Sequence, residues 1–208
     1  MNEIMTWVEA ERLSFADLLA DLRDDEWSRD SLCAGWTVQD VAAHLTLSTR
    51  LTLGMAVWGA IKARGSFDRM EADLARKRAT QFSRAELIEQ IRSTAGSEKH
   101  APGSSSLDCL LDALVHGQDI ARPLGRPRPM PVKPTIAALE HLRGNAFYGA
   151  PKRLRGVKLV ATDTDWSGGD GPDELHAPLA DLILLASGRP AGLANATGPG
   201  VACLELRI

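Results

Sequence analysis

The spacing of apolar residues changes once along the chain, and this change constrains the fold more than any other feature. Up to about residue 150, apolar side chains recur every three or four positions, as in α-helices with one buried face. From residue 155 they alternate with polar side chains, which is typical of half-buried β-strands. The sequence therefore predicts a mainly α protein, with a helical bundle over residues 1–150 and a small α+β domain over residues 151–208.

Capping boxes mark where two of the expected helices begin. Thr37 is followed three residues later by Asp40, and Ser83 is followed in the same way by Glu86. We expect the first helix to continue from Thr37 through Trp58, with a break near Gly54.

Two further helices are expected before residue 150. The first is strongly apolar, begins at Leu107 and ends at Pro123, where proline cannot continue a helix. The second extends from Thr135 to about Ala146. We expect the apolar face of each of these two helices to be buried in the bundle.

The C-terminal region mixes strand and helix patterns. Residues 155–163 and 201–208 alternate and are expected to be strands, while residues 178–187 are expected to form a short helix that opens with proline. The glycine-rich segment 167–172 is expected to be a tight loop.

Composition excludes several classes of protein. The chain has 208 residues, of which 44% are hydrophobic and 25% charged, so it is neither disordered nor collagen-like. A net charge of −3 argues against a nucleic-acid partner. The three cysteines form no CxxC pair, the N-terminus resembles no signal peptide, and the apolar runs are too short to cross a membrane. We expect a cytoplasmic monomer or homodimer with no membrane partner.

Two histidines stand inside apolar helical segments and so need a hydrogen-bond partner or a metal. His116 follows Asp112 by four residues, which places both side chains on one helix face, and His44 on a second helix could supply a third ligand. Three such ligands leave the fourth zinc position open, as in catalytic sites. An alternative interpretation is a solvated Asp112 beside a hydrogen-bonded core histidine. Asp119 is a candidate second partner of His116.

An aspartate and two cysteines near the candidate ligands are interpreted as structural residues and not as metal ligands. Asp40 also precedes a histidine by four residues, but its place in a capping box identifies it as a helix cap. Cys33 and Cys109 flank the two expected metal helices, and we interpret them as small core residues.

Longer motifs around these residues resemble a known family. Residues 33–45 (CAGWTVQDVAAHL) and 111–125 (LDALVHGQDIARPLG) resemble two signatures of the mycothiol-dependent maleylpyruvate isomerase family, within the DinB-like superfamily. Looser similarity covers residues 163–172, 182–189 and 198–200. The resemblance implies a DinB-like four-helix bundle with a small α/β C-terminal domain.

The resemblance also implies a site and a chemistry. It implies a divalent metal, usually zinc, bound by His44, Asp112 and His116, although the family more typically has glutamate at the position of Asp112. It implies mycothiol as a thiol cosubstrate that attacks a small electrophile, in a transferase or an isomerase reaction. Arg189 corresponds to an arginine expected to contact a substrate carboxylate, and a helix C-cap is its alternative role.

A second function fits the same residues. Because aspartate is one methylene shorter than glutamate, the chain could instead be a non-catalytic binding module that keeps a structural or vestigial metal site.

Overall fold

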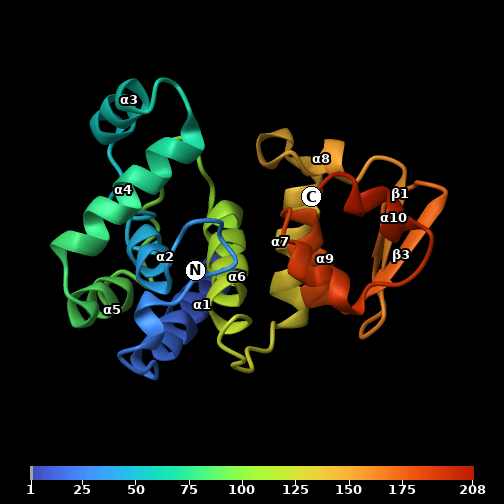
Figure 1. Ribbon diagram of the computed structural model, residues 1–208, viewed down its shortest axis with the longest axis horizontal. Helices are drawn as coiled ribbons and strands as arrows, with labels where there is room; N and C mark the ends of the chain where they lie inside the picture. Colours follow the sequence, from blue (N-terminus) through green and yellow to red (C-terminus); the bar gives the residue numbers. More distant parts are fainter. Residues whose placement is uncertain (1) are drawn as a thin grey trace. The chain divides into compact units, whose positions relative to one another are not determined.

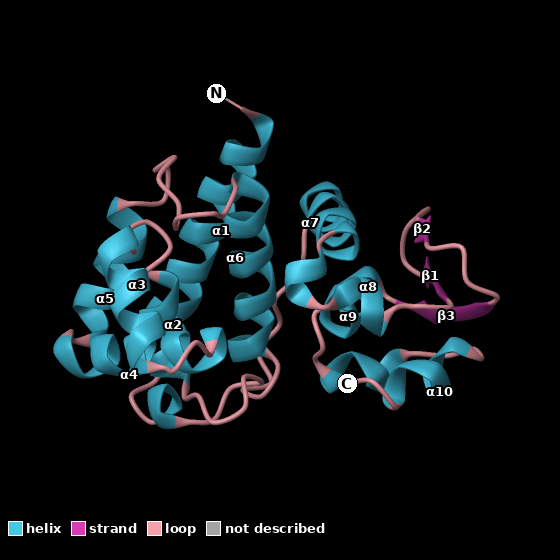
Figure 2. Cartoon of the chain, turned by 90° about the horizontal axis from the view of Figure 1, so that it is seen from above, coloured by secondary structure: helices cyan, strands magenta, loops and turns pink. Residues whose placement is uncertain are grey.

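The structure is a computed structural model that describes residues 2–208, except for the side chains of Ala56 and Ala60. It divides into two compact units, Met1–Arg128 and Pro129–Ile208. The first unit is helical, and all the strands belong to the second (Figures 1 and 2). The expected mainly α fold is therefore confirmed.

The first unit is a bundle of α-helices (Figure 1). Helix α1 packs against α5 and α6, α2 packs against α4, α5 and α6, and α3 packs against α4. The elements of this unit are α1 (Glu3–Ala20), η1 (Glu26–Ser28), α2 (Val38–Leu45), α3 (Leu53–Lys62), α4 (Phe67–Gln81), α5 (Arg84–Ser93) and α6 (Ser106–Ala121).

Both expected capping boxes are present and fix the starts of α2 and α5. The Thr37 hydroxyl accepts from the backbone N–H of Asp40 at 3.2 Å, and the Asp40 carboxylate accepts from the N–H of Thr37 at 2.9 Å. The role of Asp40 as a cap is thus confirmed. A third capping box, formed by Ser105 and Asp108, opens α6.

The helix expected from Thr37 through Trp58 is two helices, and the break lies before Gly54. Helix α2 ends at Leu45, and α3 begins only at Leu53. The Thr46 hydroxyl donates to the carbonyl of Ala43 at 2.7 Å, and the Ser48 hydroxyl donates to that of Leu45 at 3.0 Å. Such side-chain bonds compete with the helical ones, which explains why α2 stops here.

The core of the first unit gathers around one buried helix. In α6, every residue from Cys109 to Ala121 is buried except Asp112. Phe15 and Leu19 of α1 and Val41 of α2 belong to a fully buried cluster with the C-terminal end of α6. The helix that carries two of the candidate ligands is therefore also the most enclosed one in this unit.

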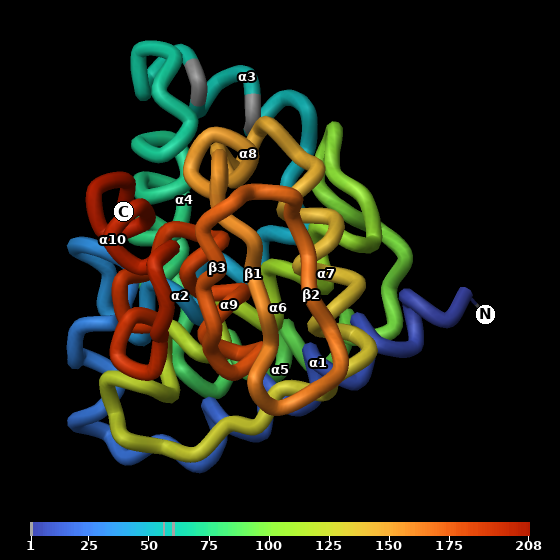
Figure 3. Tube along the Cα trace, turned by 90° about the vertical axis from the view of Figure 1, so that its right-hand side faces the viewer, coloured from blue at the N-terminus to red at the C-terminus, as the bar shows by residue number. Residues whose placement is uncertain are grey.

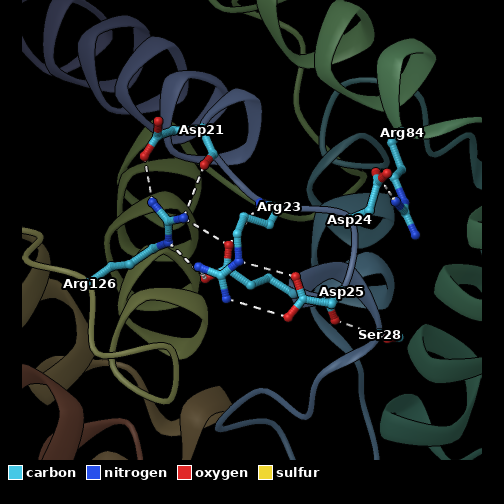
Figure 4. Close-up of polar contacts among 8 residues, drawn as sticks. Asp21, Arg23, Asp24, Asp25, Ser28, Arg84 and Arg126 are labelled. Atoms are coloured by element: carbon cyan, nitrogen blue, oxygen red, sulfur yellow. Dashed lines mark hydrogen bonds and ion pairs between the residues drawn. The ribbon is translucent and has the colours of Figure 1, made fainter.

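An ionic cluster closes one end of the bundle, where Arg126 follows α6 (Figure 4). Its guanidinium donates to Glu26 Oε2 at 2.8 Å and to Glu26 Oε1 at 3.2 Å, and it also pairs with Asp21 at the end of α1. The hydrogen bond from Arg126, with the N–H of Arg23, lowers the pKa of Glu26 to about 2. The cluster therefore fixes the chain after α6 to the end of α1 and to η1.

The second unit combines a three-stranded sheet with short helices. The strands lie in the order β2-β1-β3, with β1 parallel to β3 and antiparallel to β2 (Figure 3). Leu159 pairs in register with Leu175, and both are fully buried. The elements are α7 (Val132–Gly144), η2 (Ala146–Tyr148), α8 (Ala150–Arg153), β1 (Val157–Ala161), β2 (Ser167–Gly168), β3 (Asp173–Ala177), α9 (Leu179–Ala186), η3 (Pro190–Asn195) and α10 (Gly200–Glu205).

Two expectations for this region differ from the structure. Helix α7 packs against α9, so it belongs to the second unit. The first unit ends at Arg128 and the second begins at Pro129, rather than after residue 150. The strand expected over residues 201–208 is wrong, because this segment contains helix α10. The buried residues of α10 are Gly200 and Leu204, which are four positions apart and therefore lie on the same face of a helix.

The expected strand at β1 and the expected helix at α9 are confirmed. No helix within residues 2–208 has both the length and the apolar content needed to cross a membrane.

Candidate metal centre

Three candidate ligands from two helices converge within the first unit. His44 Nε2 lies 3.5 Å from Asp112 Oδ2, and His116 Nε2 lies 3.3 Å from Asp112 Oδ1. The two imidazole rings are 5.0 Å apart between centroids. One donor atom from each side chain lies within 4.8 Å of the others, so the three can approach a single ion. The structure therefore brings together His44, Asp112 and His116, the ligand set expected from the sequence.

Local structure explains how these side chains meet. The capping box at Thr37 sets the start of α2 and places His44 in its last turn. Asp112 and His116 are one turn apart on α6, so both face the same side. Because α2 packs against α6, the His44 ring reaches the pair on the neighbouring helix.

The site is buried except at its carboxylate. His44 is 8% exposed and His116 is 9% exposed, whereas the Asp112 side chain is 33% exposed. The Trp36 ring meets the edge of the His44 ring, with centroids 5.3 Å apart. Asp112 is therefore the most solvent-exposed of the three candidate ligands.

A second layer of contacts orients His116. Its Nδ1 lies 2.8 Å from Asp119 Oδ2, and Asp119 is fully buried. The Cys33 thiol donates to the same oxygen at 3.1 Å. Ligating histidines usually hold their second nitrogen against a carboxylate in this way, which leaves Nε2 of His116 directed at Asp112.

Cys33, His116 and Asp119 form a second group of potential metal donors. Its closest pair, His116 Nδ1 and Asp119 Oδ2, stands at hydrogen-bond distance. We therefore interpret this group as the support of the first one.

The charges at the site favour the ionised carboxylate. Burial raises the pKa of Asp112, but His44 and His116 outweigh this effect and hold that pKa far below its usual range. Burial lowers the pKa of His116, but Cys33 and Asp112 raise it well above its usual value. A metal binding here would find Asp112 ready to ligate and would displace a proton from His116.

The donor set fits a zinc ion. Two imidazole nitrogens and one carboxylate oxygen are a ligand set that zinc takes in catalytic sites, with a further position left for a substrate. The short side chain of Asp112 still reaches both histidines, so aspartate preserves the convergence. His44 Nδ1 is buried and makes no hydrogen bond within the described residues, which leaves this ring less firmly held than that of His116.

Two further groups near this site have roles that sequence reasoning did not give them. Cys33 is half-buried and packs against the core as expected, but its thiol also donates to Asp119, whereas Cys109 is buried as expected. Glu71 of α4 lies close enough to the ligands to interact with them electrostatically: burial raises its pKa, His44 lowers it and Asp112 raises it. Glu71 belongs to no motif, and only the packing of α4 against α2 brings it near the ligands.

Arg189 lies in the second unit, directly after α9. Its guanidinium donates to the carbonyl of Ser187 at 3.0 Å, and its backbone N–H donates to that of Leu184 at 2.8 Å. Its expected role toward a substrate stays a prediction.

Comparisons with known proteins agree with the fold. Residues 8–104 match the family model for the mycothiol maleylpyruvate isomerase N-terminal domain. A crystal structure of the mycothiol-dependent maleylpyruvate isomerase matches with 14% identity and a TM-score of 0.61, covering 94% of this chain and 91% of the other. A histidine-to-alanine mutant of that isomerase matches with 13% identity, a TM-score of 0.59 and the same coverage. No curated protein is significantly similar in sequence.

Proposed function

We propose that the chain, which matches the family model over residues 8–104, is a member of the mycothiol maleylpyruvate isomerase family and a metal- and thiol-dependent enzyme acting on a small electrophile. Isomerisation is the reaction to test first, because the matching structures are of an isomerase. Transfer of the thiol to the electrophile is the alternative outcome for the same site. The observation that carries the proposal is the convergence of His44, Asp112 and His116.

The residues of the first unit have distinct roles in this proposal. His44, Asp112 and His116 would hold a divalent metal, zinc by preference for this donor set. When bound, the metal supplies a cationic position that keeps a thiol in its nucleophilic thiolate form. Asp119 fixes the ring of His116, and the half-exposed side of Asp112 admits the thiol and the electrophile.

The thiol reaction needs few groups from the protein. The mycothiol thiolate forms a bond to one carbon of an alkene conjugated to a carbonyl, and the electron pair of the alkene moves onto the carbonyl oxygen as an enolate, which leaves a carbon–carbon single bond that can rotate. In an isomerase the thiolate then leaves and the alkene reforms, so mycothiol is recovered. In a transferase a proton adds to the neighbouring carbon and the adduct is released. Arg189 is proposed to bind a substrate carboxylate during either reaction.

Metal analysis of the purified protein tests the proposal. We expect about one zinc per chain in wild type prepared without a metal-binding tag, and none in His44→Ala or His116→Ala. His100→Ala is the matched control, because His100 is exposed in a loop and should leave the zinc content unchanged. A wild-type protein that takes up no zinc on titration would contradict the proposal.

A binding module with a structural or vestigial metal remains the second candidate, and Asp112 in place of glutamate is the feature that favours it. Asp112→Glu separates the two functions. An enzyme should change its rate of mycothiol-dependent turnover, whereas a binding module has no turnover to change. We further propose that the protein works in the cytoplasm, since its cysteines form no disulfide within residues 2–208.

A further inference from the structure

A small pocket of the first unit reaches from α1 to the candidate metal centre. It is lined by residues of α1, α5, α6 and the turn after α2, including Arg12, Ser48, Thr94 and Cys109. Asp112 also lines it, so one side of the pocket is the open carboxylate of the metal centre. A group bound in this pocket would therefore lie beside the metal ligands.

Arg12 is the unusual residue of this pocket. It is only 7% exposed, and its Nη1 donates to the carbonyls of Thr94, Ala95 and Ser97 at 3.3, 3.2 and 3.0 Å. Its Nη2 is buried and makes no hydrogen bond within the described residues. The three carbonyls hold the guanidinium in place, and the one side chain that interacts with it as a hydrogen-bond partner is the Cys109 thiol, so its positive charge faces no carboxylate at ion-pair distance within residues 2–208.

Such a group is costly in a folded protein. Buried charges are normally paired, and a buried donor without an acceptor destabilises the structure. Burial lowers the pKa of Arg12, while Cys109 and Asp112 oppose that shift. The nearby thiol is a weak partner, because burial raises the pKa of Cys109 to about 11 and keeps it neutral. An anionic group at Nη2 would supply both the acceptor and the countercharge.

We propose that this pocket is an anion subsite in which Arg12 Nη2 binds a carboxylate group of the electrophilic substrate. Arg12 is then a specificity-determining residue that selects carboxylate-bearing electrophiles. The inference rests on the proposed function for its substrate, and a divalent metal at Asp112 would strengthen anion binding by neutralising the negative charge on the pocket wall. With the metal bound, both ends of the pocket favour an anion.

The test uses formate, the smallest carboxylate, and formamide, its neutral analogue of nearly the same size. Binding of ¹³C-labelled formate to the zinc-loaded protein is followed by NMR line width. Arg12→Met removes the charge and keeps the length of the side chain. Ser48→Leu fills the pocket and leaves the carbonyl contacts of Arg12 intact, so it tests the subsite even where Arg12→Met does not fold. Arg92→Met is the control, since Arg92 is an exposed arginine of α5 paired with Asp17.

We expect formate to bind wild type and Arg92→Met equally, and at least tenfold more weakly to Arg12→Met and Ser48→Leu. Formamide should not bind. Equal formate affinity in all four proteins, or formate binding that depends on zinc but not on Arg12, would overturn the proposal. A pocket that holds only water would show no formate binding, which overturns it as well.

Zinc content measured on the same samples separates this inference from the proposed function. Arg12-dependent formate binding without zinc would support the subsite and contradict the metal enzyme. Stoichiometric zinc without Arg12-dependent formate binding would do the reverse.

Discussion

Gly117 lies next to His116 in α6, and its lack of a side chain allows Arg128 to cross the helix. A methyl group at this position would stand 2.2 Å from Arg128 Nε and 2.9 Å from its Cζ. The guanidinium cannot move away freely, because it donates to Glu11 Oε2 at 3.1 Å and to the Ser14 hydroxyl at 3.0 Å. Both Glu11 and Arg128 have buried side chains. Gly117→Ala is therefore expected to displace Arg128 and to break the pair.

Two opposing effects set the magnitude. Alanine favours a helix interior over glycine by about 1 kcal/mol. Separating a buried ion pair costs about 3–5 kcal/mol, because one charge is left without its partner. The loss is larger than the gain, so we expect Gly117→Ala to reduce the free energy of unfolding by about 2–4 kcal/mol.

Urea unfolding followed by circular dichroism measures this difference. Gly54→Ala is the matched control, since Gly54 is also helical and has open space where its methyl group would lie. That variant should be as stable as wild type or up to about 1 kcal/mol more stable. If Gly117→Ala were also stabilised, Arg128 would not be held against α6, and the reasoning would be refuted.

Three further predictions concern the candidate site and its supports. Asp119→Ala should weaken zinc binding by about 10–100-fold, because His116 loses the carboxylate that orients it. Competition with a chelator measures the zinc affinity, and an unchanged affinity would contradict the role of Asp119. The pKa of Glu26 is lowered from 4.5 to about 2 by Arg126, so its stabilising effect is complete above about pH 4.5 and is lost as the pH falls toward 2. Urea unfolding of wild type and Glu26→Gln should accordingly differ at pH 6 and converge near pH 2, and a constant difference would refute this. Thr37→Ala should lower the free energy of unfolding by about 0.5–2 kcal/mol, whereas Thr37→Ser keeps the cap, and equal losses in urea unfolding would argue against the capping box.

The parts of the fold that could be predicted are those encoded in local spacing. The capping box of Thr37 and Asp40 marks the start of α2 because both partners lie within one turn. Asp112 and His116 could be placed on one face because a helix fixes four-residue neighbours. His44 required a further inference, namely that a histidine in an apolar segment needs a partner.

The features that escaped prediction depend on tertiary contacts. The apolar pattern of α7 does not reveal that its buried face packs on α9 and not on the bundle. Alternation over residues 201–208 suggested a strand, but burial of Gly200 and Leu204 on one side selects a helix. Arg12, Cys33 and Glu71 come near the site from separate elements, and no spacing in the sequence connects them.

The near-complete burial of α6 has a consequence for exchange of its amide hydrogens with solvent. Opening this helix exposes the core of the unit, so its amides from Cys109 to Ala121 should exchange only when the whole unit unfolds. Helix α3 carries exposed apolar side chains, including Leu53 and Trp58, and should exchange far sooner. Asp112 and His116 therefore keep their spacing for the lifetime of the folded unit. Two of the three ligands are therefore pre-organised for an ion, and only the side chain of His44, on the shorter helix α2, would have to adjust its position on binding.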